Sequence, residues 1–238
     1  MMSKLIKAKR KIQILPQPTD ESCGPTCLQS VYQYHGLDIS LPQLLKEVKE
    51  VKGGGTLAVM MGNHALAHGF DATIYSYNLQ MFDPTWFEKS TDLALKLSEQ
   101  RVYKTSNKFR QATDAYLTFL SLGGSIRFQE LNRNLLTRYL ESGMPILAGL
   151  SATYLYQSAR EIPKYNIYHD TKGEPAGHFV VLSSLSGEDI LIADPLNPNP
   201  ISMEEQYYKI PIRRVIHAIL LGMITYDANL LIITPKSA

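Results

Sequence analysis

The sequence predicts an α+β fold in which a mainly helical half precedes a half built around an antiparallel sheet. Helix-type apolar spacing dominates the first half, whereas strand-type apolar runs are concentrated in the second. No Pro/Ser-rich linker flanks the least familiar stretch, residues 76–128, and 238 residues with 45% apolar content can bury one substantial core. We therefore expect a single domain over residues 1–238 with a helical elaboration at about 76–128; a separate helical subdomain is the alternative.

Capping signals set the limits of the elements expected in the first half. The helix that starts at Cys23 should end at His35-Gly36, because glycine readily adopts the left-handed conformation of a helix C-terminus. Ser40 and Gln43 form a capping-box pattern for the next helix, and Thr56 is the candidate cap of a third. The expected order is a tail at 1–11, a short strand at 12–15, helices at 23–34, after 40 and at 56–68, and a half-buried strand at 70–75.

Residues 76–128 are expected to form two helices. Asp83-Pro84 can cap and start the first, because proline fits the first helical turn, where its missing N–H removes no hydrogen bond. The second carries an aromatic and aliphatic stripe and should end at Gly123-Gly124. The expected apolar positions of the first helix are Phe87, Ala94 and Leu97.

The second half is expected to supply the sheet. A long polar and aromatic loop, residues 152–176, leads directly into His178 and is a candidate wall of a substrate cleft, because long loops in compact domains are often functional. A hairpin turning near Ser186-Gly187 would place His178 and Asp194 directly opposite each other, with Cβ atoms about 4.5–5.5 Å apart. A turn shifted by one residue would change that pairing. The other expected elements are a helix that ends at Gly143, strands at 145–150, 178–183, 189–194 and 230–233, and a helix near 213–221.

The composition argues against several classes of partner. A net charge of +2 is too small to indicate nucleic-acid binding, and the basic start of the chain is expected to be a solvated terminus without the apolar run of a secretory signal. The longest apolar stretch, 215–224, contains His217 and Gly222 and is too short to cross a membrane. Cys23 and Cys27 lie four residues apart on one expected helix, which does not readily allow a disulfide. A cytoplasmic location is therefore expected.

The residues around Cys23 have the pattern of a reactive thiol. Pro25 indicates that Cys23 lies at a helix N-terminus, where free N–H groups and the helix dipole favour a thiolate. Such a nucleophile needs a histidine to move its proton and a third group to orient that histidine, and His178 and Asp194 can supply both. Cys27 is expected to be a small buried apolar residue. A structural cysteine, a core histidine and a turn aspartate are the alternative interpretations.

Four motifs occur in a fixed order along the chain: Gln17, then Cys23-Gly24-Pro25-Thr26-Cys27-Leu28, then His178-Phe179-Val180-Val181, then Ala193-Asp194-Pro195. This order resembles the peptidase C39 and C39-like family of bacterial, papain-like cysteine peptidases, best known for removing leader peptides after a double glycine. The resemblance implies a papain-like fold with Cys23 as nucleophile, His178 as base, Asp194 as its orienter and Gln17 as an oxyanion donor. Ser22 replaces the acidic residue that precedes the cysteine in C39 peptidases, and no transporter segment follows, so double-glycine specificity is not implied.

Three functions are compatible with these residues. The first is a thiol hydrolase, in which Cys23 attacks the carbonyl of a peptide or small amide and water releases the resulting thioester. The Cys23 N–H and the Gln17 side chain would hold the oxyanion. The second is a peptidyl or acyl transferase, in which an amine replaces water as the acceptor. The third is a peptide-binding module without turnover, against which the intact set of Cys23, His178 and Asp194 argues. No cofactor is expected.

Two further patterns resemble ligand sites. His64 and His68 are four residues apart, as zinc-ligand pairs on helices are, but Ala65 stands where a metalloprotease would hold its glutamate base. No third ligand is evident from the sequence, so we expect no metal and interpret this segment as a helix end packed under the cleft. Gly53-Gly54-Gly55 is not followed by the Gly-Lys-Ser/Thr of a phosphate-binding loop.

Overall fold

The computed structural model describes residues 11–51, 55–88, 91–163, 165 and 167–236. Most of the expected basic tail and of the glycine run lies outside these ranges. The described strands are β1 Phe70–Ser76, β2 Ser125–Arg127, β3 Ile146–Ser151, β4 Glu161–Ile162, β5 Ile167–Tyr168, β6 Gly177–Ser186, β7 Asp189–Ala193, β8 Tyr207–Pro211 and β9 Asn229–Pro235. The described helices are α1 Cys23–His35, α2 Leu41–Glu47, α3 Ala58–Ala67, α4 Leu93–Tyr103, α5 Asn107–Ser121, α6 Arg133–Glu141, α7 Ala152–Tyr156 and α8 Ile212–Leu221, with short 3-10 helices η1 Pro84–Phe87 and η2 Gly222–Thr225.

Within these ranges, seven strands form one sheet in the order β2-β1-β9-β3-β6-β7-β8, and β4 and β5 form a separate small sheet. Neighbouring strands of the large sheet are antiparallel, except for the parallel pair β1 and β2. The expected α+β class with a mainly antiparallel sheet is therefore confirmed. No helix in the described part of the chain has both the length and the apolar character needed to cross a membrane.

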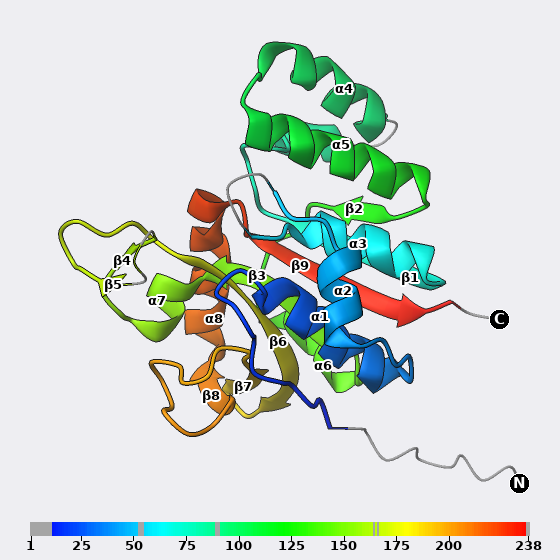
Figure 1. The fold of residues 1–238 in the computed structure, drawn as a ribbon. Helices are drawn as coiled ribbons and strands as arrows, with labels where there is room; N and C mark the ends of the chain where they lie inside the picture. The colour runs from blue at the N-terminus through cyan, green and yellow to red at the C-terminus, as the bar shows by residue number, and fades with distance from the viewer. Residues whose placement is uncertain (1–10, 52–54, 89–90, 164, 166, 237–238) are drawn as a thin grey trace, which may run out of the picture.

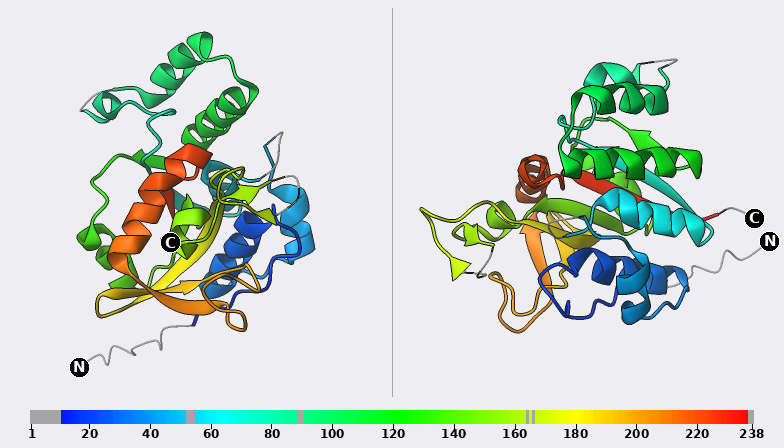
Figure 2. Two further views of the ribbon diagram at one scale, coloured as in Figure 1. Left: turned by 90° about the vertical axis from the view of Figure 1, so that its left-hand side faces the viewer. Right: turned by 45° about the horizontal axis from the view of Figure 1, so that its top comes forward.

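Helices cover both faces of the large sheet (Figures 1 and 2). On one face, α1, α2, α3 and α5 share an apolar cluster with Phe179 and Val181 of β6. On the other face, α6, α7 and α8 share a second cluster with Val180 and Leu182. Because consecutive side chains of a strand point to opposite faces, β6 must be apolar at every one of these positions, which explains its continuous apolar run.

Several predicted elements of the first half are confirmed, and two details are wrong. α1 ends at Gly36, which adopts a left-handed conformation with φ of 90°. The Ser40 hydroxyl accepts a hydrogen bond from the Gln43 N–H and caps α2. Thr56, however, is not a cap, because α3 begins at Ala58 and its preceding residue makes no side-chain cap bond.

The predicted strand at 12–15 is the second wrong detail. This segment has no strand hydrogen bonds and instead borders the sheet through one tyrosine. The Tyr207 hydroxyl donates to the Ile12 carbonyl and accepts from the Ile14 N–H, at 3.1 and 2.9 Å. A side chain therefore takes the place of a neighbouring strand.

Residues 76–128 differ from the expected pair of helices. The helix that starts after Asp83 is only the 3-10 turn η1, and α4 starts separately after Asp92, whose carboxylate accepts from the Leu95 N–H. A second N-cap thus divides the predicted helix. The strand β2, unpredicted, runs parallel to β1. Residues of α4 and α5 join the same apolar cluster as α1 and α3, which supports our proposal that this region is an elaboration of a single domain.

The later elements follow the prediction more closely. The expected helix that ends at Gly143 is α6, and the expected strands at 145–150 and 230–233 are β3 and β9. The tail helix is α8. Residues 152–176, predicted as a loop, contain α7 and the small β4–β5 sheet.

Candidate active site

The two cysteines of α1 occupy different environments. Cys23 is the first residue of the helix, is half-buried, and lines a cavity of about 210 Å³, hereafter the Cys23 cavity. Cys27 lies one turn further on, is fully buried, and donates from Sγ to the Phe179 carbonyl over 3.3 Å. Burial, with smaller contributions from Cys23 and Asp194, raises the pKa of the Cys27 thiol. The prediction that Cys27 is a buried apolar-type residue is confirmed, and Cys23 is the thiol that faces a cavity.

The loop before Cys23 is fixed by Ser22. This side chain is buried; its hydroxyl donates to the Thr19 carbonyl over 2.7 Å and accepts from the Thr19 N–H over 3.0 Å. A carboxylate has no proton to donate and would leave the first of these bonds unmade. The serine that departs from the C39 pattern is therefore integral to the turn that presents Cys23.

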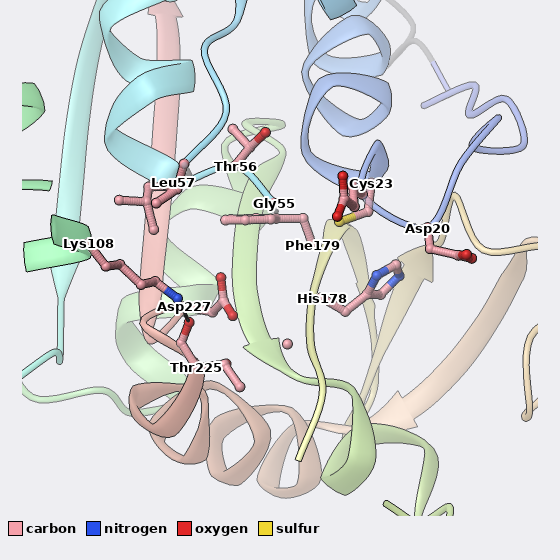
Figure 3. A pocket seen from close by; sticks show the side chains of 13 residues that line it. Asp20, Cys23, Gly55, Thr56, Leu57, Lys108, His178, Phe179, Thr225 and Asp227 are labelled. Carbon is pink, nitrogen blue, oxygen red and sulfur yellow. Dashed lines mark hydrogen bonds between the residues drawn. The ribbon is translucent and has the colours of Figure 1, made fainter. Parts of the chain in front are cut away.

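His178 links Cys23 to Asp194. The His178 Nε2 lies 2.8 Å from Asp194 Oδ1, and the Cys23 side chain is hydrogen-bonded to the same ring. Figure 3 shows the Cys23 and His178 side chains next to each other at the cavity. Because Nε2 faces the aspartate, Nδ1 is the nitrogen left for the thiol. Burial by itself lowers the pKa of His178, but the charge and hydrogen bond of Asp194, with those of Cys23, outweigh it and raise the pKa to about 10.

Four donors surround the fully buried Asp194 carboxylate. Oδ1 also accepts from the Leu196 N–H over 2.9 Å, and Oδ2 accepts from the hydroxyls of Tyr156 and Tyr208 over 2.8 and 2.5 Å. Burial alone raises the pKa of Asp194, but the charge of His178 and these hydrogen bonds outweigh it, so the pKa is lowered. The two tyrosines could not be predicted from the sequence, because no local pattern relates a tyrosine to an aspartate 14 or 38 residues away.

The predicted pairing of His178 directly opposite Asp194 is wrong. The β6–β7 hairpin pairs Ser186 with Asp189 and, nearer the site, Val181 with Ala193. Continuing this ladder by one residue places Asp194 opposite residue 180, two positions from His178. The side chains still meet, because diagonal neighbours on one face are about 7–8 Å apart at Cα and within reach of long side chains.

A bulge in β6 decides that the two side chains share a face. The register shifts by one residue between Leu182 and Ser184. Without this shift Asp194 would lie opposite Val181, whose side chain points to the face away from that of His178. The extra residue, Ser183, is held by a 2.9 Å hydrogen bond from its hydroxyl to the Leu191 carbonyl. The local sequence around Ser183 carries no pattern that predicts such a bulge.

Gln17 lies next to these residues but is engaged elsewhere. Its backbone N–H donates to the Pro195 carbonyl over 2.8 Å, which ties this segment to the Asp194 loop. Its side-chain Nε2 donates to the Thr19 carbonyl over 3.0 Å, and Oε1 is buried without a hydrogen-bond partner. The structure thus brings Cys23, His178 and Asp194 together, whereas the Gln17 amide is bonded to the loop that precedes Cys23.

The far side of the Cys23 cavity carries two ionisable residues that no sequence motif indicated. Figure 3 shows Lys108 and Asp227 on one side of the cavity and Cys23 and His178 on the other. Burial raises the pKa of Asp227 to about 7, although Thr225, Lys108 and His178 act to lower it. A Cβ atom at Gly177 would lie only 1.9 Å from Asp227 Oδ2, so the residue before His178 must be glycine for this carboxyl to pack there.

A second cavity, of about 220 Å³, is also lined by His178. Its lining includes Gln17 and Tyr156 and several residues of the segment 152–176, so it is hereafter the Tyr156 cavity. Asp20, Gly177 and His178 line both cavities. The expectation that residues 152–176 form a wall beside His178 agrees with this lining.

Comparison with known proteins supports one fold family. The sequence pattern of the Peptidase_C39-like family matches residues 9–215, and no functionally curated protein matches the chain. A structure described as a C39-like peptidase from Bacillus anthracis aligns with a TM-score of 0.50 at 15% identity, covering 95% of this chain and 96% of that one. The expected papain-like, C39-type fold is thereby confirmed.

Two other solved structures align more loosely. One is a double glycine motif protease from an AMS/PCAT transporter in complex with its leader peptide, with a TM-score of 0.46 at 16% identity, covering 97% of this chain and 96% of that one. The other is the peptidase domain of Streptococcus ComA, a bifunctional ABC transporter involved in a quorum-sensing pathway. It aligns with a TM-score of 0.46 at 15% identity and covers 94% of this chain and 99% of that one.

Proposed function

The chain belongs to the Peptidase_C39-like family, and from this premise we propose that it is a cysteine peptidase with a Cys23–His178–Asp194 triad. The observation that carries the proposal is the continuous chain of contacts from a cavity-facing thiol, through a buried imidazole, to a buried carboxylate. An imidazole whose pKa is raised to about 10 holds its proton at neutral pH. In the proposed reaction the thiol and this imidazole act as a thiolate–imidazolium pair, which combines a strong nucleophile with a ready acid.

The reaction uses these groups in two stages. The Cys23 thiolate attacks the amide carbonyl, and the C–N bond breaks as the His178 imidazolium gives its proton to the leaving amine. The now neutral His178 then takes a proton from water, which attacks the thioester and releases the acid. Asp194 stays ionised throughout, holding the ring orientation and stabilising its charged form.

We propose that Gln17 helps to stabilise the oxyanion that forms when the thiolate attacks the carbonyl. The first N–H groups of α1 have no acceptor within the helix and are available to the developing charge beside Cys23. For Gln17 to be the second donor, its Nε2 must leave the Thr19 carbonyl and turn toward Cys23. Gln17→Ala should then lower kcat with little change in KM, whereas an amide that only fixes the loop should change the stability instead.

The substrate class follows from the two cavities. Because the Cys23 cavity and the Tyr156 cavity meet at Gly177 and His178, an extended chain that fills both crosses the thiol and the imidazole. A peptide is the substrate that has an amide bond at such a crossing and side chains on both sides. The leader peptide bound by the transporter protease is a precedent in that protein only.

Selective alkylation tests the triad directly. We expect iodoacetamide at pH 6 to label Cys23 rapidly and Cys27 slowly, because only the first faces a cavity beside an imidazolium. Peptide mapping by mass spectrometry measures both rates in one sample, so Cys27 is an internal control. Equal slow labelling of both thiols would contradict the proposal and favour a peptide-binding module. If acyl-enzyme forms, adding an amine and analysing the products separates hydrolysis from transfer.

A further inference from the structure

Outside the proposed catalytic site, three side chains converge on one point between α2 and α3. They are Glu47, the last residue of α2, His64 of α3, and His68, which follows α3. His64 Nε2 lies 3.0 Å and His68 Nε2 lies 3.9 Å from the same oxygen, Glu47 Oε2. All three atoms lie within 4.8 Å of one another. The sequence showed the two histidines but no third ligand; the fold supplies it from a different helix.

Each of the three side chains has a partner on its other polar atom. Gln43 Nε2 donates to Glu47 Oε1 over 2.9 Å, and the buried Tyr32 hydroxyl lies 2.8 Å from His64 Nδ1. His68 Nδ1 lies 2.8 Å from the His64 carbonyl oxygen. Bound metals characteristically have ligands whose outer atoms are oriented in this way. The arrangement leaves Nε2, Nε2 and Oε2 as the three inward-facing atoms.

The hydrogen bond of His68 identifies which of its ring nitrogens faces Glu47. A carbonyl oxygen only accepts hydrogen bonds, so His68 Nδ1 carries a proton. Nε2 is therefore the His68 nitrogen that faces the Glu47 carboxylate, at 3.9 Å from Oε2. A cation placed between these two atoms would contact both. His64 contacts Glu47 over 3.0 Å, and the second ring stacks on the first with centroids 4.0 Å apart and presents its Nε2 to the same oxygen.

We propose that Glu47, His64 and His68 bind a divalent first-row transition metal, with Zn²⁺ as the best match to two imidazoles and one carboxylate. Bonds of about 2.0–2.2 Å to a tetrahedral ion place ligand atoms about 3.4 Å apart. The distances of 3.0 and 3.9 Å bracket this value. Because the two rings stack with an interplanar angle of 13°, one ring must rotate for both Nε2 atoms to reach the same ion. A cavity of about 440 Å³ lined by Glu47 and His64 provides entry and space for a water as the fourth ligand.

The role that this position supports is structural. The metal would join the end of α2 to the end of α3, two helices whose connection includes residues 52–54 and which both pack into the α1 face of the sheet. A cross-link of this kind stabilises the folded state by the free energy of metal binding. The proposed metal site is separate from the proposed triad of Cys23, His178 and Asp194. None of its three residues lines the Cys23 cavity.

Zinc binding is best measured in a Cys23→Ala background, because the proposed catalytic thiol and imidazole can themselves hold zinc. We expect one equivalent of Zn²⁺ to compete with a chromophoric chelator and to raise the Tm of this protein. His68→Ala and Glu47→Gln should each weaken binding by more than about ten-fold and abolish the Tm increase, whereas His217→Ala, on the exposed face of α8, should change neither.

A milder variant keeps the test valid if either ligand variant fails to fold. Tyr32→Phe retains the ring and removes only the partner of His64 Nδ1, so zinc affinity should fall by about 10–100-fold in a folded protein. Far-ultraviolet circular dichroism of the metal-free variants checks folding. Absence of zinc binding in the Cys23→Ala protein, or binding that is equal in all four variants, would overturn the proposal.

Discussion

His178 and His64 are both buried imidazoles with a carboxylate oxygen at hydrogen-bonding distance, 2.8 Å for Asp194 and 3.0 Å for Glu47. Their side chains are almost equally covered, with 7% and 6% exposed. Nevertheless their pKa values move in opposite directions. Burial by itself lowers the pKa of both histidines. At His178, Asp194 and Cys23 outweigh burial and raise the pKa. At His64, Glu47 does not outweigh burial, so the pKa is lowered.

The difference lies in the partners rather than in the histidines. The Asp194 side chain is 0% exposed, so its charge acts on His178 with little screening, whereas that of Glu47 is 39% exposed and is screened by water. The third group also differs. Cys23 favours a charged ring at His178, whereas the neighbouring His68 disfavours one at His64. The buried carboxylate therefore favours a charged ring at His178, whereas the exposed one does not do so at His64.

Replacing each histidine should separate the two roles, and the loss of His178 should have the largest effect. We expect His178→Ala to lower kcat/KM for any cleaved peptide by at least about 10⁴-fold while the protein stays folded, because the thiol loses its proton acceptor and counter-ion. The alkylation of Cys23 at neutral pH should slow in parallel. His217→Ala is the matched control and should keep wild-type kinetics. A folded His178→Ala protein with unchanged alkylation would show that His178 is only a core residue.

Removing the buried carboxylate should have the next largest effect. Asp194→Ala leaves the ring unoriented and the hydroxyls of Tyr156 and Tyr208 without their acceptor, and should lower kcat/KM by about 10³–10⁴-fold. Asp194→Asn can still accept from His178, while the tyrosine hydroxyls turn to accept from its amide, so activity should be intermediate. The measurement is kcat/KM, or the rate of Cys23 acylation, for the three proteins. Wild-type activity in Asp194→Ala would reduce the triad to a Cys–His dyad.

The smallest expected effect is a change in how the free energy of unfolding depends on pH. This effect reports the charge of Asp194 acting on His178. The pKa of His178 is about 10 in the folded protein against about 6.5 when unfolded, so the folded state binds the proton more tightly. The corresponding stability is complete below pH 6.5 and is lost as the pH rises toward 10. In Asp194→Asn the main cause of the shift is absent, so this loss should be complete at a lower pH. Urea unfolding from pH 6 to 10 measures both curves, and superimposable slopes would refute the assignment.

The parts of the site that the sequence determined are those governed by local rules. Pro25 and Gly36 place the start and end of α1 and therefore put Cys23 at a helix N-terminus. The continuous apolar run around His178 predicts a buried strand, and the apolar residues before Asp194 predict its partner. Each of these inferences depends on backbone preferences within a few residues, which act in the same way wherever the segment lies in the fold.

Tertiary structure alone decided which residues meet. The bulge at Ser183 turns Asp194 to the His178 face, Tyr156 and Tyr208 arrive from α7 and β8 to hold its carboxylate, and Glu47 reaches His64 and His68 from another helix. These contacts join residues that are 14 to 38 positions apart in the chain. Their geometry depends on how whole elements pack, and their energetics depend on how completely that packing excludes water. Neither quantity is a property of a short stretch of sequence, so the spacing that suggested a triad could not reveal its register, and the spacing of two histidines could not reveal their carboxylate.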